Sequence, residues 1–256
     1  MRHIMLYTLL ENMRARIYLS AIGLLLLIMG ISWIGTQINY NLGAYHFAML
    51  SFGMGLTKLL VTAIALFLPV FHISMEYEKG TAHVLWAKIE NRSTYYTGKF
   101  WAFLILIFIL ILFAVVLIGG LALFRGAQLK QILYLRYFIF GQILESACIL
   151  SMVFLVYALI RAPLLASLLT LLMVYFSIFL EIAKEVAAGS SQIIMKYFYL
   201  AMYYGMPKLS YFSLENHILY SRELSLYTLY AVFLYSICFS AVCLSLANII
   251  FSKREM

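Results

Sequence analysis

The chain has 256 residues, of which 65% are apolar and 11% are charged, and its formal net charge is +8. A soluble domain has about 45–50% apolar and about 25% charged residues, because its water-facing surface needs polar groups. Together with a mean hydropathy of +0.98, this composition excludes a soluble enzyme, a nucleic-acid-binding module and a disulfide-rich secreted scaffold as first interpretations, and it indicates a polytopic membrane protein.

Six apolar runs are long enough to cross the hydrocarbon core, which takes about 20 helical residues. They are residues 17–37, 52–73, 100–124, 135–160, 163–185 and 225–250. The connections between them are too short to form a separate catalytic domain. We therefore expect residues 1–256 to fold as one all-α transmembrane domain.

The distribution of basic residues predicts the topology, because Lys and Arg accumulate on the cytoplasmic side. Three arginines precede the first run, whereas residues 37–51 contain neither Lys nor Arg. This asymmetry places the N-terminus in the cytoplasm. Six crossings then return the C-terminus to the same side, beside Lys253 and Arg254. Arg161 marks a tight turn between the fourth and fifth runs.

The first sixteen residues can form an amphipathic helix that lies along the cytoplasmic interface. Its apolar side would consist of Ile4, Met5, Leu9 and Met13. The alternative is a plain cytoplasmic extension of the first run.

The connection after the second run, residues 72–100, predicts a short amphipathic helix on the cytoplasmic side. Glu76 and Glu78 begin an exposed turn, Gly80 interrupts the backbone, and Thr81 can cap the following helix. The apolar face of this helix consists of Val84, Leu85 and Ile89. A helix held between two membrane spans suits docking of a cytoplasmic partner, and an ordinary solvated loop is the alternative.

Two ionisable residues lie inside apolar runs, where a charge costs about 2.5–3.5 kcal/mol at mid-bilayer. Lys58 lies about 9 Å and Glu145 about 13 Å from the outer ends of their helices at 1.5 Å per residue. They could pair with each other, or both could line a substrate path. The alternative for Lys58 is that its side chain extends outward to the interface.

Residues 186–224 are rich in tyrosine and phenylalanine and contain Pro207. Such side chains suit the headgroup region, where an apolar ring and a polar hydroxyl are both accommodated. We expect one or two short helices that dip into the outer leaflet without crossing it. The alternative is a re-entrant hairpin.

The 72–100 connection resembles the signature loop of the type-2 ABC exporter permeases. In that family an acidic pair precedes Gly-Thr, and a short apolar helix, a basic residue and a Gly-Lys pair follow. The matching residues are Glu76, Glu78, Gly80, Thr81, Leu85, Arg92, Gly98 and Lys99. The middle of this connection departs from the family pattern, because Lys88-Ile89-Glu90 stands where the family often has a proline. A weaker match lies at residues 205–214, where a proline precedes an aromatic residue and a leucine.

The resemblance implies a transport subunit and not an enzyme. Two permease chains, identical or different, would pack together in a bacterial inner membrane, and each would engage a separate ATP-hydrolysing subunit. The residues implied in this coupling are Glu76, Glu78, Gly80, Thr81, Val84, Leu85, Arg92, Gly98 and Lys99. The chain has no GxxxxGK(S/T) phosphate loop, so ATP would be used by the partner.

The substrate stays open, although an apolar and aromatic path favours an amphipathic cargo. The five histidines show no metal-ligand spacing, so we expect neither a metal nor a cofactor in this chain, and no nucleic-acid partner. Two other interpretations remain. One is a non-catalytic membrane assembly or immunity protein, and the other is an intramembrane enzyme, which would need paired acids or a Ser-His pair at membrane depth.

Lys58→Ala and Glu145→Ala are each expected to lower transport while the chain is still produced, because each removes a charge from the expected substrate path. The measurement is cargo transport beside the amount of chain in the membrane. Normal transport by both variants would contradict this role.

Overall fold

The computed structural model contains helices and no strands over the residues that it describes, which are 2–14, 17–38, 45–79, 93–178, 180, 196–197, 203, 207–214, 219 and 224–253. The helices are α1 (Arg2–Arg14), α2 (Ile17–Ile38), α3 (Tyr45–Glu78), α5 (Ser93–Phe124), α6 (Leu129–Ile160), α7 (Pro163–Ile178), the 3-10 helix η2 (Leu209–Phe212) and α11 (Leu226–Lys253). Each of the six predicted apolar runs therefore coincides with a helix.

Within the described part of the chain, four helices are long and apolar enough to cross a membrane, namely α3, α5, α6 and α11. Two more are apolar over shorter stretches, Leu19–Gly35 in α2 and Pro163–Ser177 in α7. The fifth run was predicted to reach residue 185, but residues 181–185 lie outside the described residues. A helical membrane protein follows from these lengths, and the six-span topology stays a prediction.

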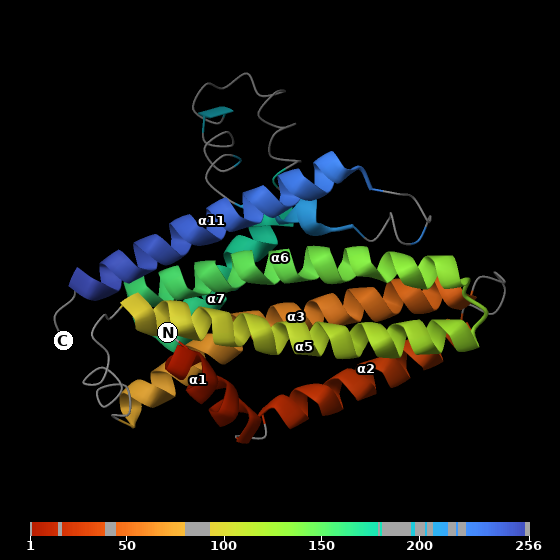
Figure 1. The fold of residues 1–256 in the computed structure, drawn as a ribbon, viewed down its shortest axis with the longest axis horizontal. Coiled ribbons are helices and arrows are strands. Elements are labelled where there is room, and N and C mark those ends of the chain that lie inside the picture. Colours follow the sequence, from red (N-terminus) through yellow and green to blue (C-terminus); the bar gives the residue numbers. More distant parts are fainter. Residues whose placement is uncertain are drawn as a thin grey trace.

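The helices form an elongated bundle with α6 at its centre. Figure 1 shows α3, α5 and α6 running along one another, with α2 and α11 on opposite sides. Helix α6 packs against α3, α5, α7 and α11, and it is the most buried of the four long helices. Helix α1 and the C-terminal end of α11 lie at the same end of the bundle (Figure 1).

The turns at the two ends of α6 use left-handed backbone conformations. Gly126 has φ 84° in the turn between α5 and α6, and Arg161 has φ 60° at the end of α6. The Arg161 N–H donates to the Tyr157 carbonyl at 2.9 Å, and Pro163 begins α7 two residues later. This geometry ends one helix and starts the next at once. The predicted tight turn at Arg161 is confirmed.

The face of α1 that enters the bundle overlaps only in part with the predicted apolar side, of which Ile4 is buried and the Met13 side chain lies outside the described residues. The buried face consists of Ile4, Thr8 and Asn12, which are buried and recur every fourth residue, while Met5 and Leu9 are only half-buried. Helix α1 packs against α5 and α2. Contact with these neighbours therefore sets the buried face, and the apolar pattern of the helix alone does not.

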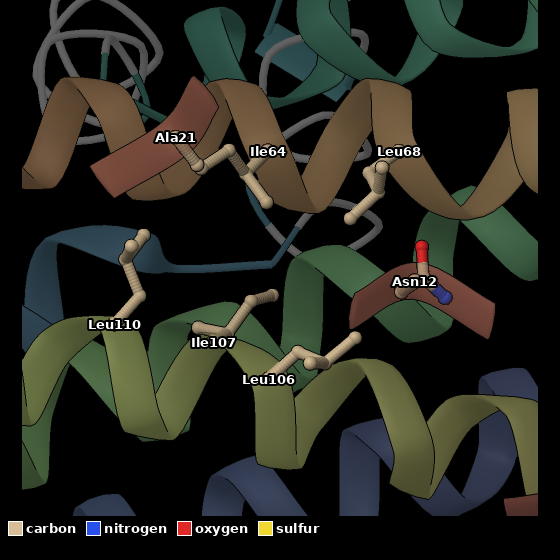
Figure 2. Close-up of a pocket in the computed structure, with 7 residues that line it drawn as sticks. All are labelled: Asn12, Ala21, Ile64, Leu68, Leu106, Ile107 and Leu110. Carbon is tan, nitrogen blue, oxygen red and sulfur yellow. The ribbon is translucent and has the colours of Figure 1, made fainter. Parts of the chain in front are cut away.

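A small gap remains where α1 meets α2, α3 and α5. Its volume is about 40 Å³, which is large enough to admit a water molecule. Figure 2 shows that Asn12 is the polar residue among those drawn, which otherwise are Ala21, Ile64, Leu68, Leu106, Ile107 and Leu110. The Asn12 Nδ2 donates to the Thr8 carbonyl at 2.8 Å, and the buried Asn12 Oδ1 has no hydrogen-bond partner among the described residues. We interpret the gap as a packing void, because a bound water needs at least two polar partners.

The segment 207–214 packs deep against the bundle. Its 3-10 helix η2 contacts α6 and α7, and the Lys208 N–H donates to the Tyr235 hydroxyl of α11 at 2.8 Å. It meets α6 at Gly141, twelve residues or about 18 Å along that helix. The structure thus shows a short helix in this segment, while its predicted dip into the outer leaflet stays a prediction. Most of 186–224 lies outside the described residues.

Gly141→Ala is expected to destabilise the chain by about 1–3 kcal/mol, the usual cost of overpacking. An ideal Cβ at Gly141 would lie 2.5 Å from the Phe212 carbonyl oxygen, and a backbone atom cannot rotate away. The matched control is Gly120→Ala in α5, where a Cβ meets nothing within 4 Å. Helix propensity makes that control neutral or stabilising. Thermal unfolding in detergent measures both, and equal shifts would contradict the close approach.

Candidate functional site

A candidate site is a cavity of about 610 Å³ between α3, α6, α7 and the segment 207–214. This volume falls in the range of about 300–1,000 Å³ that is typical of small-molecule sites. Its wall is mostly apolar, and the larger apolar side chains are Leu59, Leu66, Phe67, Leu171 and Val174. The polar groups that line it include Lys58, Glu145, Ser210 and Ser213.

Lys58 and Glu145 form an ion pair in the wall of this cavity. The Lys58 Nζ lies 3.2 Å from Glu145 Oε2, and it donates a hydrogen bond to Ser213 Oγ at 2.8 Å. The two residues therefore pair, as the first sequence alternative had it, and both line one cavity. That this cavity is a substrate path stays a prediction. The ammonium is held by Glu145 and Ser213, so it does not simply extend outward to the interface.

Three elements bring these groups together. Lys58 comes from α3 and Glu145 from α6, and these two helices pack directly against each other. Gly141 precedes Glu145 by one helical turn, so both lie on the same face of α6. The missing side chain at Gly141 lets the Phe212 backbone approach closely, which brings Ser213 within reach of Lys58.

A second polar cluster lies at the other end of α3, where the sequence predicted exposed coupling residues. Glu76 is 3% exposed and Lys99 is fully buried. Glu76 Oε1 accepts from Lys99 Nζ at 2.5 Å, and Glu76 Oε2 accepts from the Tyr95 hydroxyl at 2.5 Å. The prediction that Glu76 begins an exposed turn is therefore wrong.

Glu76 is buried because α3 is longer than predicted and continues to Glu78 instead of ending near residue 73. His72 and Glu76 are four residues apart, so they share one face of α3. Tyr95 and Lys99 have the same spacing on α5. Since α3 and α5 pack together, the two faces meet. The four-residue spacing of polar residues before the connection, in α3, and after it, in α5, was the sequence signal that could have predicted this cluster.

The other predicted coupling residues differ in what the structure says of them. Glu78 is exposed, and its carboxylate accepts a hydrogen bond of 3.4 Å from Ser74. Gly98 is buried in α5. The remaining coupling residues lie outside the described residues, and they are Gly80, Thr81, Val84, Leu85 and Arg92.

Helix α1 joins the second cluster through Glu11, which sequence reasoning did not connect to it. The Lys99 ammonium can only donate, so His72 Nδ1, 3.2 Å away, accepts. His72 Nε2 then carries the hydrogen and faces Glu11 Oε2 at 3.4 Å. Burial raises the pKa of Glu11, the nearby Glu76 carboxylate raises it further, and Lys99 and Lys79 oppose this.

Glu11, His72 and Glu76 bring three potential metal donors within 4.8 Å of one another. Carboxylates and imidazoles of this kind bind zinc and related ions. Here the Lys99 ammonium contacts both Glu76 and His72, so the protein supplies its own cation at the centre of the group. The cluster is therefore interpreted as a structural ion-pair network.

Glu76→Gln and Lys99→Met are each expected to destabilise the chain by about 3–5 kcal/mol, because each leaves the other charge buried and unpaired. The double variant should lose less than the sum of the two. The control is Glu78→Gln, an exposed neighbour that should change stability by less than about 0.5 kcal/mol. Equilibrium unfolding in detergent measures all four. Unchanged stability of Glu76→Gln would contradict the buried pair.

Comparison with protein-family models and with curated proteins gives no match to this chain. The assignment of a function therefore depends on the residues and the geometry described above.

Proposed function

We propose that this chain is the membrane-spanning permease subunit of an ATP-driven exporter. The observation that carries the proposal is the Lys58–Glu145 pair in the wall of the 610 Å³ cavity. Ionisable residues inside membrane-crossing helices are costly and usually mark a path for substrate or ions. A cavity that combines this pair with an apolar wall suits an amphipathic cargo.

The proposed topology has six crossings with both termini in the cytoplasm of a bacterial inner membrane. Helix α1 and the C-terminal end of α11 lie at one end of the bundle, as an even number of crossings requires (Figure 1). The three arginines of residues 1–16 assign that end to the cytoplasm. A second permease chain, identical or different, would complete the transport path.

Energy would come from a separate ATPase subunit, because the chain has no phosphate loop. The partner would dock on the connection between α3 and α5, around Val84 and Leu85. In this proposal Glu76 and Lys99 support the docking site from inside the protein. Their ion pair ties the end of α3 to the start of α5, so a push on the connection would reach both helices.

One contact favours a different function, an intramembrane hydrolase with a Ser-Lys pair. Ser213 Oγ lies 2.8 Å from Lys58 Nζ, and some hydrolases activate serine with lysine. Activation requires the lysine to accept the serine proton. Here Lys58 donates to Ser213 and is also paired with Glu145. This arrangement suits binding better than nucleophile activation.

The test is purification of the tagged full-length chain from its native membranes. We expect a Walker-type ATPase to co-elute and hydrolyse ATP, and Leu85→Glu to remove that ATPase while the chain stays in the membrane. The matched control is Leu226→Glu, which places the same charge at an exposed leucine at the start of α11. This control should retain the ATPase.

Two results would overturn the proposal. One is transport by the purified chain without any ATP-hydrolysing partner. The other is labelling that places residues 80–92 on the side opposite α1. A loss of hydrolase activity in Ser213→Ala would support the alternative.

A further inference from the structure

We infer that the cavity between α3, α6, α7 and the segment 207–214 binds an amphiphile with an anionic head, a phosphate or a carboxylate, and that Lys58 is the group that recognises it. This inference rests on the proposed function, because it names the class of substrate for the same cavity. Its experiment measures binding directly and does not depend on ATP.

The two charges of the pair are not equally accessible. The Lys58 side chain is 25% exposed, whereas the Glu145 side chain is 5% exposed. Of the two side chains that line the cavity, Lys58 is therefore the more accessible to a ligand. A pair built to attract a cationic head would expose the carboxylate instead. Charge complementarity thus selects an anion.

The hydrogen bonds of Lys58 leave room for a ligand. An ammonium carries three hydrogens. One is directed to Ser213 Oγ at 2.8 Å, and one faces Glu145 Oε2 at 3.2 Å. Among the described residues no acceptor holds the third, so it is available to an oxygen of a bound anion. Ser210 lines the same cavity and offers a hydroxyl as a further donor.

The rest of the cavity suits an alkyl chain. Leu66, Phe67 and Val174 line it with apolar surface. Leu59 is 66% and Leu171 is 38% exposed, although both also line the cavity. The cavity therefore reaches the surface of the bundle between α3 and α7. In a membrane, that opening would let the tail of an amphiphile enter sideways from the lipid.

The experiment uses the full-length chain in phosphatidylcholine nanodiscs. The probes share a dodecyl chain and differ in the head, which is phosphate, trimethylammonium or maltoside. We expect saturable binding of dodecyl phosphate that is at least about tenfold tighter than binding of the other two, the usual worth of a charge-assisted hydrogen bond. Tighter binding of the trimethylammonium probe would overturn the inference.

Variants of the pair should shift affinity in opposite directions. Lys58→Met should weaken dodecyl phosphate binding about tenfold, and Lys58→Arg should restore most of it. Glu145→Gln should strengthen binding, because it removes the competing carboxylate from Lys58. The matched control is Lys130→Met, which removes an exposed lysine at the start of α6 and should change nothing. Loss of binding in Glu145→Gln would overturn the inference.

A double variant tests the inference even if a single variant fails to fold. Lys58→Met with Glu145→Gln removes both charges, so neither is left buried without its partner. It should fold and bind all three probes alike. If it still prefers the phosphate head, Lys58 is not the recognition group.

The remaining arms identify the source of the ligand and separate the two proposals. Nanodiscs with added phosphatidylglycerol should compete with dodecyl phosphate if the natural ligand is an anionic membrane lipid, and should not compete if it is a free single-chain amphiphile. Either result supports an anionic head.

If no probe binds but the ATPase still co-elutes, the substrate class is wrong and the proposed function stands. If dodecyl phosphate binds but no ATPase is found, the substrate class stands and the proposed ATP-driven function is wrong.

Discussion

A charge inside an apolar helical bundle must be paired, and this constraint sets the position of α3. Two ion pairs hold that helix, Lys58 with Glu145 of α6 and Glu76 with Lys99 of α5. Lys58 and Glu76 are 18 residues apart, or about 27 Å along the helix. Each pair is expensive to break, because the partner would be left charged in a medium that solvates charge poorly. The register of α3 against α5 and α6 depends on both.

The two pairs differ in solvent access, and this difference separates their roles. Glu76 and Lys99 are sealed between α3 and α5, and Tyr95 and His72 satisfy their remaining polar atoms. Aromatic rings close that end of the bundle, since Phe251 of α11 packs against Tyr95 and Tyr96. Lys58 instead borders a cavity. A sealed pair suits mechanical support, whereas a pair open on one side suits recognition of a charged ligand.

The buried Glu76 also changes how the connection after α3 is understood. A sequence resemblance implied that Glu76 and Lys99 take part in coupling to a partner, yet both side chains are buried. The sequence predicted an exposed turn at Glu76 and Glu78, because the second apolar run ends at residue 73. The helix is longer than the apolar run that predicted it, and polar residues in its last turn face α5. Apolarity marks where a helix crosses a membrane, and it does not mark where the helix ends.

The sequence by itself determined the helical class, the position of each apolar helix and the turn at Arg161, because these follow from local composition and backbone preference. It also identified Lys58 and Glu145 as exceptional, although not which of the two side chains is the more exposed. Only the tertiary structure decided the buried face of α1, the partners of Glu76, and the approach of Ser213 past Gly141. Those features join segments far apart in the chain, and the geometry of packing between helices, which no local pattern encodes, brings them together.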